Sequence, residues 1–194
     1  STAITADTKL PPFEINGLNA GRGVTIVGSG VTPLQLTGTD VRLYFLNFKG
    51  CTSRAVAQSG GYLTLSDCSF TGNAGGVECG DKSGLIALNC TFADNSASGS
   101  GGAVLMSAGS VAAAFANCTF ARNKATTGSA VASADGMFAF IHCTIVPGGS
   151  NAPVSAGGNE AYFLNTLIAK PSGGTAVEAG TTTAICSSLG TQSQ

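Results

Sequence analysis

The side chains able to do acid–base or nucleophilic chemistry are few in this chain. Its 194 residues include ten Asp and Glu, nine Lys and Arg, seven Cys and one His, His142. Glycoside hydrolysis needs two carboxylates facing one groove, and lyases and epimerases need clustered acidic residues with a Lys, Arg or Tyr base. The acidic residues are scattered here, and Glu78 and Glu178 are expected on one outward column but far apart. We therefore predict a protein that is not an enzyme and that uses no cofactor.

The cysteines show neither a metal-binding nor a disulfide pattern. No two form a Cys-x-x-Cys pair, and one His cannot complete a zinc site, so no metal site is predicted. Four cysteines precede a Phe or Ile by two residues and are expected to form an inward column of reduced thiols: Cys68, Cys90, Cys118 and Cys143. Stacked side chains in a parallel sheet lie about 4.8 Å apart, whereas a disulfide needs Cβ atoms about 3.8 Å apart.

Composition excludes several classes of protein. Charged residues make up 10% of the chain and the net charge is −1, so no basic surface is available for nucleic acid. Hydrophobic residues make up 43%, which argues against disorder. The longest purely apolar piece, Val111–Ala116, is far short of the roughly 20 residues that span a bilayer. We expect a folded chain with neither nucleic-acid partner nor membrane span.

A repeat of about 22 residues organises the chain. Segments 66–73, 88–95 and 116–123 share a Cys, a Phe two residues later and an Asn three residues after that. The Phe position recurs along the chain as Ile26, Phe48, Phe70, Phe92, Phe120, Ile145 and Ile168. A second marker, an apolar residue after a turn, recurs as Leu34, Val56, Val77, Val104, Val131, Val154 and Val177. Two markers that share one drifting period predict a solenoid.

Alternation within the repeat predicts short strands. Leu88, Cys90 and Phe92 are expected on one side of a strand, with Asn89 and Thr91 on the other. Further strands are expected at 62–65, 77–79, 104–106 and 137–140, separated by Gly, Asn, Ser and Asp. Three short strands per coil predict an all-β fold, a parallel β-helix of seven to eight coils. We expect one domain over residues 1–194, with coils over about 3–186 and a flexible tail at 187–194.

The turn that follows the Phe strand carries Asn in three coils. These residues, Asn73, Asn95 and Asn123, are expected to form an internal ladder in which each amide satisfies neighbouring backbone groups. A role in ligand binding is the minor interpretation. Cys51 falls in the same slot one coil earlier.

The repeated motifs resemble a known group of proteins. Phe-x-x-Asn occurs at Phe70–Asn73, Phe92–Asn95 and Phe120–Asn123, and Gly-Gly-Ala-Val occurs at Gly101–Val104. These motifs resemble the polymorphic outer membrane protein repeats of bacterial autotransporters and, more widely, right-handed parallel β-helix repeat proteins. The opening segment 15–28 resembles their first coil. The resemblance implies a right-handed β-helix in an exported or cell-surface adhesin, extracellular in location.

Other functions remain open, because one scaffold hosts several of them. A polysaccharide-active enzyme, a lyase or an epimerase, is the first alternative to an adhesion or recognition module. An ice-binding protein or a structural subunit of a larger assembly is the second. Such an assembly, or another chain, would cover an end of the rod, where strand edges are open.

Two outward polar columns are expected to offer a contact surface for carbohydrate or protein. One contains Asp67, Asn89, Asn117, His142 and Asn165, and the other Ser69, Thr91, Thr119 and Thr144. An ordinary solvated sheet face would carry the same residues. Asn89-Cys-Thr91 and Asn117-Cys-Thr119 also read as N-glycosylation sequons, but their expected place in the middle of a strand disfavours modification.

One corner of the solenoid is enlarged in two neighbouring coils. The span between the two markers is 7 residues from Phe70 to Val77, but 12 from Phe92 to Val104 and 11 from Phe120 to Val131. The added residues, Ser96–Ser100 and Lys124–Gly128, should lie on one face, where solenoids often bind partners. Asp94, Arg122 and Lys124 place charges at this corner, and Asp94 and Arg122 are expected to pair. An insertion without a role would look the same.

Overall fold

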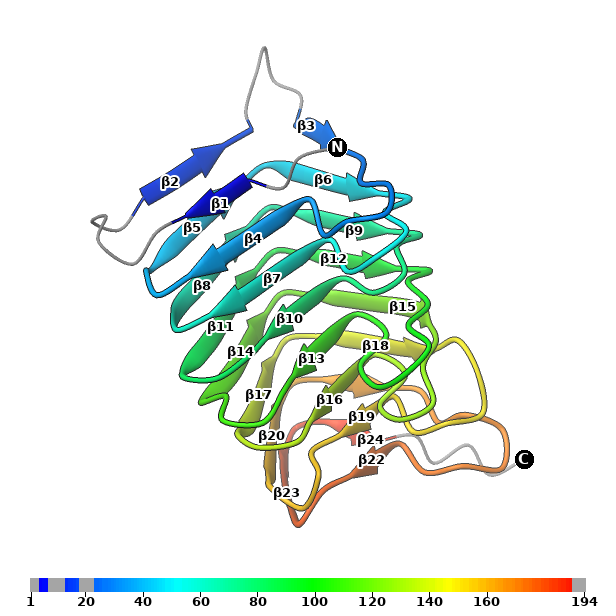
Figure 1. The fold of residues 1–194 in the computed structure, drawn as a ribbon. Coiled ribbons are helices and arrows are strands. Elements are labelled where there is room, and N and C mark those ends of the chain that lie inside the picture. The colour runs from blue at the N-terminus through cyan, green and yellow to red at the C-terminus, as the bar shows by residue number, and fades with distance from the viewer. Residues whose placement is uncertain (1–3, 7–12, 18–22, 190–194) are drawn as a thin grey trace.

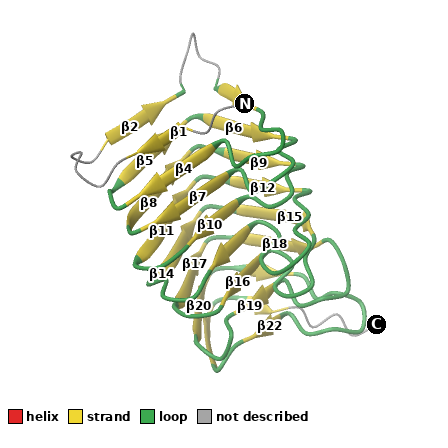
Figure 2. Cartoon of the chain, in the orientation of Figure 1, coloured by secondary structure: helices red, strands yellow, loops and turns green. Residues whose placement is uncertain are grey.

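The computed structural model describes residues 4–6, 13–17 and 23–189, and within them the chain forms strands, turns and loops without a helix (Figure 2). The 24 strands make three parallel sheets of eight strands, which form the sides of a rod (Figure 1). Each coil gives one strand to each sheet in turn, so strand n pairs with strand n + 3. The predicted parallel β-helix is confirmed, with eight coils.

The first sheet contains β1 (Ile4–Ala6), β4 (Leu34–Thr37), β7 (Val56–Ser59), β10 (Val77–Cys79), β13 (Val104–Met106), β16 (Val131–Ser133), β19 (Val154–Ser155) and β22 (Val177–Glu178). The second contains β2 (Phe13–Asn16), β5 (Val41–Tyr44), β8 (Gly61–Ser66), β11 (Ser83–Leu88), β14 (Ala112–Ala116), β17 (Met137–Ile141), β20 (Glu160–Leu164) and β23 (Thr181–Ile185). The third contains β3 (Val24–Ile26), β6 (Leu46–Lys49), β9 (Ser69–Thr71), β12 (Thr91–Ala93), β15 (Thr119–Asn123), β18 (Thr144–Pro147), β21 (Leu167–Ile168) and β24 (Ser188–Leu189).

Both sequence markers set the register of the sheets. The Val marker is aligned coil by coil in the first sheet, as in the pairs Val56–Val77 and Val77–Val104. The Phe marker is aligned in the third sheet, where the rings of Phe70 and Phe92 stack with centroids 5.0 Å apart. Phe48 and Phe120 extend this stack at 4.8 and 4.9 Å, and all four side chains are fully buried. The predicted inward Phe column is confirmed.

The thiol column is also confirmed. Cys68, Cys90, Cys118 and Cys143 are buried and unbridged, as are Cys51 and Cys79, whereas Cys186 is exposed. Burial raises the pKa of the Cys79 thiol to about 12. A hydrogen bond with the thiol of Cys118 and burial together raise the pKa of Cys90, also to about 12. At neutral pH the thiols of Cys79 and Cys90 are therefore protonated packing groups.

The asparagine ladder lies inside the rod, beside the Phe stack. Asn73, Asn95 and Asn123 are at most 2% exposed. Each Nδ2 donates to the carbonyl of the Phe marker one coil earlier, as from Asn95 to Phe70 O at 2.9 Å. The Oδ1 of Asn73 accepts the backbone N–H of Cys51, so Cys51 occupies the same slot. The predicted internal ladder is confirmed.

A single residue turns the chain from the second sheet to the third, and this corrects two expectations. Asn89 and Asn117 hold this position with φ of 54° and 53°, in the left-handed region that Asn tolerates. The sequons therefore lie at exposed corners and not in the middle of a strand. Because the corner interrupts the alternation, Leu88 and Asn89 both face outward, and Leu88 is 39% exposed rather than inward.

The C-terminal boundary of the last coil also differs from expectation. Leu167 and Ile168 of β21 pair with Ser188 and Leu189 of β24. The predicted tail at 187–194 is therefore wrong at Ser188 and Leu189, because both belong to the eighth coil. Residues 190–194 lie outside the described residues.

Candidate functional site

The nine residues predicted to bind lie along the third sheet and its two corners. Thr91, Thr119 and Thr144 are register partners on its outer face, with Thr91 and Thr119 exposed and Thr144 half-buried. Asn89, Asn117 and His142 precede these strands at the corner from the second sheet, and all three are exposed. Asp94, Arg122 and Lys124 lie at or beyond the opposite ends of the strands. The structure thus brings the predicted residues to one side of the rod, as a flat surface.

The Asn column is a hydrogen-bonded surface ladder. Asn117 Nδ2 donates to Asn89 Oδ1 at 3.3 Å, and Asn89 Nδ2 donates to Asp67 Oδ1 at the same distance. The Thr column ends beyond Thr144, where the next outward residue is Leu167. A run of three threonines is shorter than the flat array that the ice-binding alternative calls for.

Asp94 and Arg122 form the predicted pair across the enlarged corner. Arg122 Nε donates to Asp94 Oδ1 at 2.8 Å and Nη2 donates to Oδ2 at 2.7 Å, a two-point contact between neighbouring coils. These hydrogen bonds lower the pKa of Asp94 and raise that of Arg122. Lys124 adds a weaker field that also lowers the pKa of Asp94. The pair is exposed and fixes side-chain direction more than it stabilises the fold.

A buried arginine, which sequence reasoning missed, holds the enlarged corner against the rod. Arg54 Nη2 donates to Ser100 O at 2.7 Å and Nη1 donates to Gly101 O at 3.1 Å. Its Nε pairs with Glu78 Oε2 at 3.1 Å, and only 14% of the Arg54 side chain is exposed. Burial lowers the pKa of Arg54, and the charge of Glu78 opposes this shift. A Cβ at Gly75 would lie 2.9 Å from Arg54 Cγ, so a glycine makes room for the guanidinium chain.

Neighbouring corner loops are also bonded to each other. Ser96 pairs with Lys124, and Ser100 with Thr127, as isolated parallel bridges. Thr126 donates from its backbone N–H and from its Oγ1 to Gly99 O, both at 2.8 Å. In the following coil, Asn151 Nδ2 donates to Ala125 O at 2.9 Å. The enlarged corner is therefore an ordered surface that continues the solenoid repeat.

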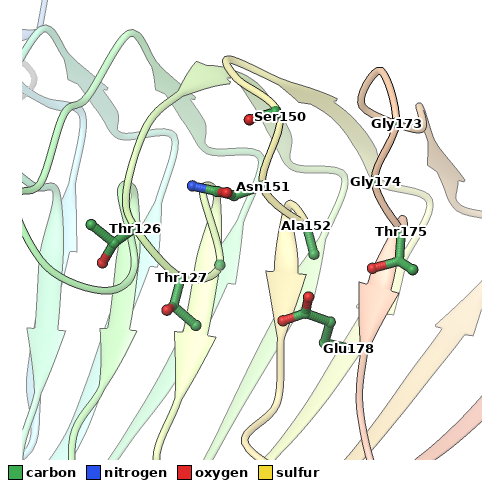
Figure 3. Close-up of a pocket in the computed structure, with 10 residues that line it drawn as sticks. Thr126, Thr127, Ser150, Asn151, Ala152, Gly173, Gly174, Thr175 and Glu178 are labelled. Carbon is green, nitrogen blue, oxygen red and sulfur yellow. The ribbon is translucent and has the colours of Figure 1, made fainter.

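A polar groove of about 360 Å³ opens between three successive corner loops. Figure 3 shows Thr126 and Thr127 on one side, Ser150 to Ala152 in the middle, and Thr175 with Glu178 on the other side. The lining contains three threonine hydroxyls, a serine hydroxyl, one amide and the carboxylate of Glu178. Of these, Thr126 Oγ1 and Asn151 Nδ2 already donate to backbone carbonyls. No ion pair or hydrogen bond of the described residues engages that carboxylate. Sequence reasoning placed Lys124–Gly128 at the enlarged corner but missed Thr175 and Glu178 as parts of the groove.

The groove holds one carboxylate. Glu78 and Glu178 do share an outward column of the first sheet, linked through Leu105, Ala132 and Ser155. Four coil spacings of about 4.8 Å put them about 19 Å apart, well beyond the roughly 5–9.5 Å of a glycosidase pair. Within the described ranges, no group of three His, Cys, Asp or Glu side chains is arranged to hold a metal ion. The groove is built to donate and accept hydrogen bonds.

None of the described residues forms a helix long and apolar enough to cross a membrane. Comparison of the chain with curated proteins and with solved structures found no match. A family model described as "right handed beta helix region" matches residues 19–168. Because this match covers most of the chain and the sheets show the same architecture, the protein belongs to the right-handed β-helix family.

Proposed function

We propose that the chain is a recognition module without catalytic activity, exported or exposed at a cell surface, which binds carbohydrate through the corner groove. The observation that carries this proposal is the lining of the groove: neutral hydroxyl and amide groups beside one unpaired carboxylate. Sugars present the complementary donors and acceptors, and a carboxylate accepts strong hydrogen bonds from sugar hydroxyls. The Phe-x-x-Asn and Gly-Gly-Ala-Val motifs, which resemble those of autotransporter adhesins, support the assignment to adhesion.

Polysaccharide cleavage is the competing function on this fold, and the spacing of the carboxylates favours binding. Hydrolysis by two carboxylates would need a second acid beside Glu178, and Glu78 of the same column lies about four coils away. Lys170 and Gly173 line a second hollow, which adjoins the groove at Gly173. Among the described residues Glu178 is the one charged side chain that lines the groove, so we expect neutral sugars among the ligands rather than sugars with a carboxylate or sulfate.

The test is a glycan panel in which binding and product formation are measured together. We expect binding without turnover by the unaltered chain. The double variant Thr175→Val/Glu178→Gln keeps side-chain size and should lower affinity at least tenfold, because both side chains line the groove and neither makes a hydrogen bond or ion pair with the described residues. Thr71→Val, in β9 of the third sheet and outside both the groove and the predicted binding residues, is the matched control and should bind normally. Equal binding by the double variant, or release of sugar products, would contradict the proposal.

A further inference from the structure

Two N-glycosylation sequons occupy the same position in neighbouring coils, at the corner between the second and third sheets. They are Asn89-Cys-Thr91 and Asn117-Cys-Thr119. In each sequon the Asn is the left-handed residue that makes the turn, and the Thr begins the following strand, β12 or β15. N-linked glycans are bulky and lie on surface turns of exported proteins, so this corner is a suitable place for one.

The fold separates the side chains of each sequon in the way that an acceptor requires. Asn89 and Thr91 are exposed, and so are Asn117 and Thr119. The Cys between them is buried in both coils. An oligosaccharyltransferase recognises the Asn amide together with the hydroxyl two residues later, and both groups are on the outside here. A glycan on either Asn would extend into solvent without displacing a packed side chain.

The surface ladder of these amides is compatible with the modification. Asn117 Nδ2 donates to Asn89 Oδ1, and Asn89 Nδ2 donates to Asp67 Oδ1, both at 3.3 Å. A primary amide carries two N–H groups, and N-glycosylation replaces one of them. Each amide therefore retains one N–H, which is the number that the ladder uses.

We propose that Asn89 and Asn117 are acceptors for N-linked glycans in a compartment that holds an oligosaccharyltransferase. The Asn Nδ2 attacks the anomeric carbon of a lipid diphosphate-linked oligosaccharide. A carbon–nitrogen bond forms, the bond between that carbon and the diphosphate oxygen breaks, and a proton passes from Nδ2 to a base of the transferase while the lipid diphosphate leaves. The proposal rests on the export that the proposed function includes, and it is independent of sugar binding by the groove.

The glycans leave the corner groove open. The sequons precede strands of the third sheet, whereas the groove is lined by loops that follow strands of the third sheet and by Glu178 of the first. The exposed Asn and Thr columns of the third sheet would then be covered by the sugar of the chain itself. A partner would reach the groove from the other corner of that sheet.

The test is expression of the full chain, behind a cleavable secretion signal, in a eukaryotic secretory host. We expect a glycan that peptide N-glycosidase removes, and peptide mass spectrometry should locate the resulting aspartates at positions 89 and 117. Thr91→Val and Thr119→Val should each lose the glycan of their own sequon, and the double variant should lose all of it. Thr91→Ser and Thr119→Ser keep the hydroxyl and are the matched controls, which should stay glycosylated.

Secreted and cell-retained chains are both analysed, so that a variant that fails to leave the cell still gives a result. A parent chain without glycan in both fractions would overturn the proposal, as would a double valine variant that keeps the glycan. Loss of sugar binding by the groove would leave these results unchanged, so the failure of the proposed function can be told apart from the failure of this proposal.

Two added sequons test whether the corner makes the modification compatible with the fold. His142→Asn creates Asn-Cys-Thr at the same exposed corner of the next coil and should give a folded, secreted chain with an additional glycan. Ala97→Thr creates a sequon on Asn95, which is fully buried, so the chain glycosylated there should be absent from the secreted protein. Secretion of a folded chain glycosylated at Asn95 would overturn the structural basis of the proposal.

Discussion

Asn95 accepts two hydrogen bonds from Asn73 through a single oxygen. Its Oδ1 receives the backbone N–H of Asn73 at 3.0 Å and the Nδ2 of the same residue at 2.9 Å. Asn95 in turn donates by the same two groups to Asn123 Oδ1. The ladder ties the turns of successive coils together where the backbone leaves the third sheet and has fewer strand partners.

Removing the middle residue of this ladder should be costly. Asn95→Ala removes the acceptor of the Asn73 backbone N–H and one of the two acceptors of Asn73 Nδ2, which keeps Phe48 O. It also removes the donor to Phe70 O, all within the interior. We expect a loss of about 3–5 kcal/mol in the free energy of unfolding, measured by urea titration. Asn117→Gly, at an exposed corner with positive φ, should cost less than about 1 kcal/mol. Similar losses in the two variants would show that the buried ladder contributes little.

Thiol labelling should distinguish the exposed Cys186 from the six buried cysteines. In the native protein a water-soluble thiol reagent should modify Cys186 quickly, since it is exposed, and the six buried cysteines slowly. In denaturant without reductant all seven should react, because none is bridged. Mass spectrometry of the labelled peptides gives the assignment. A native-state label on Cys90, or a missing label in denaturant, would contradict the buried, reduced column.

Stability should fall at alkaline pH through the buried thiols. The pKa of Cys79 is raised to about 12 in the folded chain from its ordinary value of about 9, because burial disfavours the thiolate. Its contribution is fully present below about pH 9 and is lost as the pH rises toward 12, because the unfolded chain releases the proton first. Replacing Cys79 by Ala should therefore flatten the decline, by about 2 kcal/mol at pH 10.5. Parallel urea titrations at pH 7.5 and 10.5 measure the difference, and equal slopes for both proteins would refute it.

Arg54 should control the order of the enlarged corner. Arg54→Met keeps the apolar stem but removes the donors to Ser100 O and Gly101 O and leaves Glu78 without its partner. We expect a loss of about 2–3 kcal/mol, because the pair is mostly buried. Faster proteolysis at residues 96–101 should accompany it.

The control for this experiment is Arg42→Met. Arg42 pairs with Glu14 across an exposed surface, with half of each side chain in solvent. Its loss should cost at most about 1 kcal/mol and leave the corner resistant to protease. Arg54→Met is compared with Arg42→Met in unfolding free energy and in the rate of proteolysis at residues 96–101. If the two variants agree in both, the strand pairing alone holds the corner.

The sequence predicts the register of this fold because the same residue types stack in successive coils. Phe70, Phe92 and Phe120 repeat as an inward column, and the same spacing locates the thiols and the buried asparagines. The Asp94–Arg122 pair follows from the same alignment. Each of these features recurs at the coil repeat, so it can be recognised in the amino-acid sequence alone.

The features that sequence reasoning missed are not periodic. Leu88 faces solvent because a left-handed residue, Asn89, interrupts the alternation at a corner. Arg54 donates to the carbonyls of Ser100 and Gly101, nearly fifty residues further along the chain, and this arginine is not part of the repeat. The groove around Glu178 joins loops of unequal length from three coils, so no motif marks it. The contact between Gly75 and Arg54 of the preceding coil likewise follows no sequence motif.

The enlarged corner has a consequence for how this chain can be altered. Between the second and third sheets one left-handed residue makes the turn in every coil from β5 onward, although seven residues separate β2 from β3 in the first coil. Between the third and first sheets the span varies from 7 to 12 residues while both markers stay aligned. This corner accommodates changes in loop length while the strands of successive coils stay in register. Foreign peptides grafted at Gly99 and at the equivalent positions of neighbouring coils would therefore be displayed in a row along the rod, spaced by the coil repeat. The fold of the rod would not depend on their sequence.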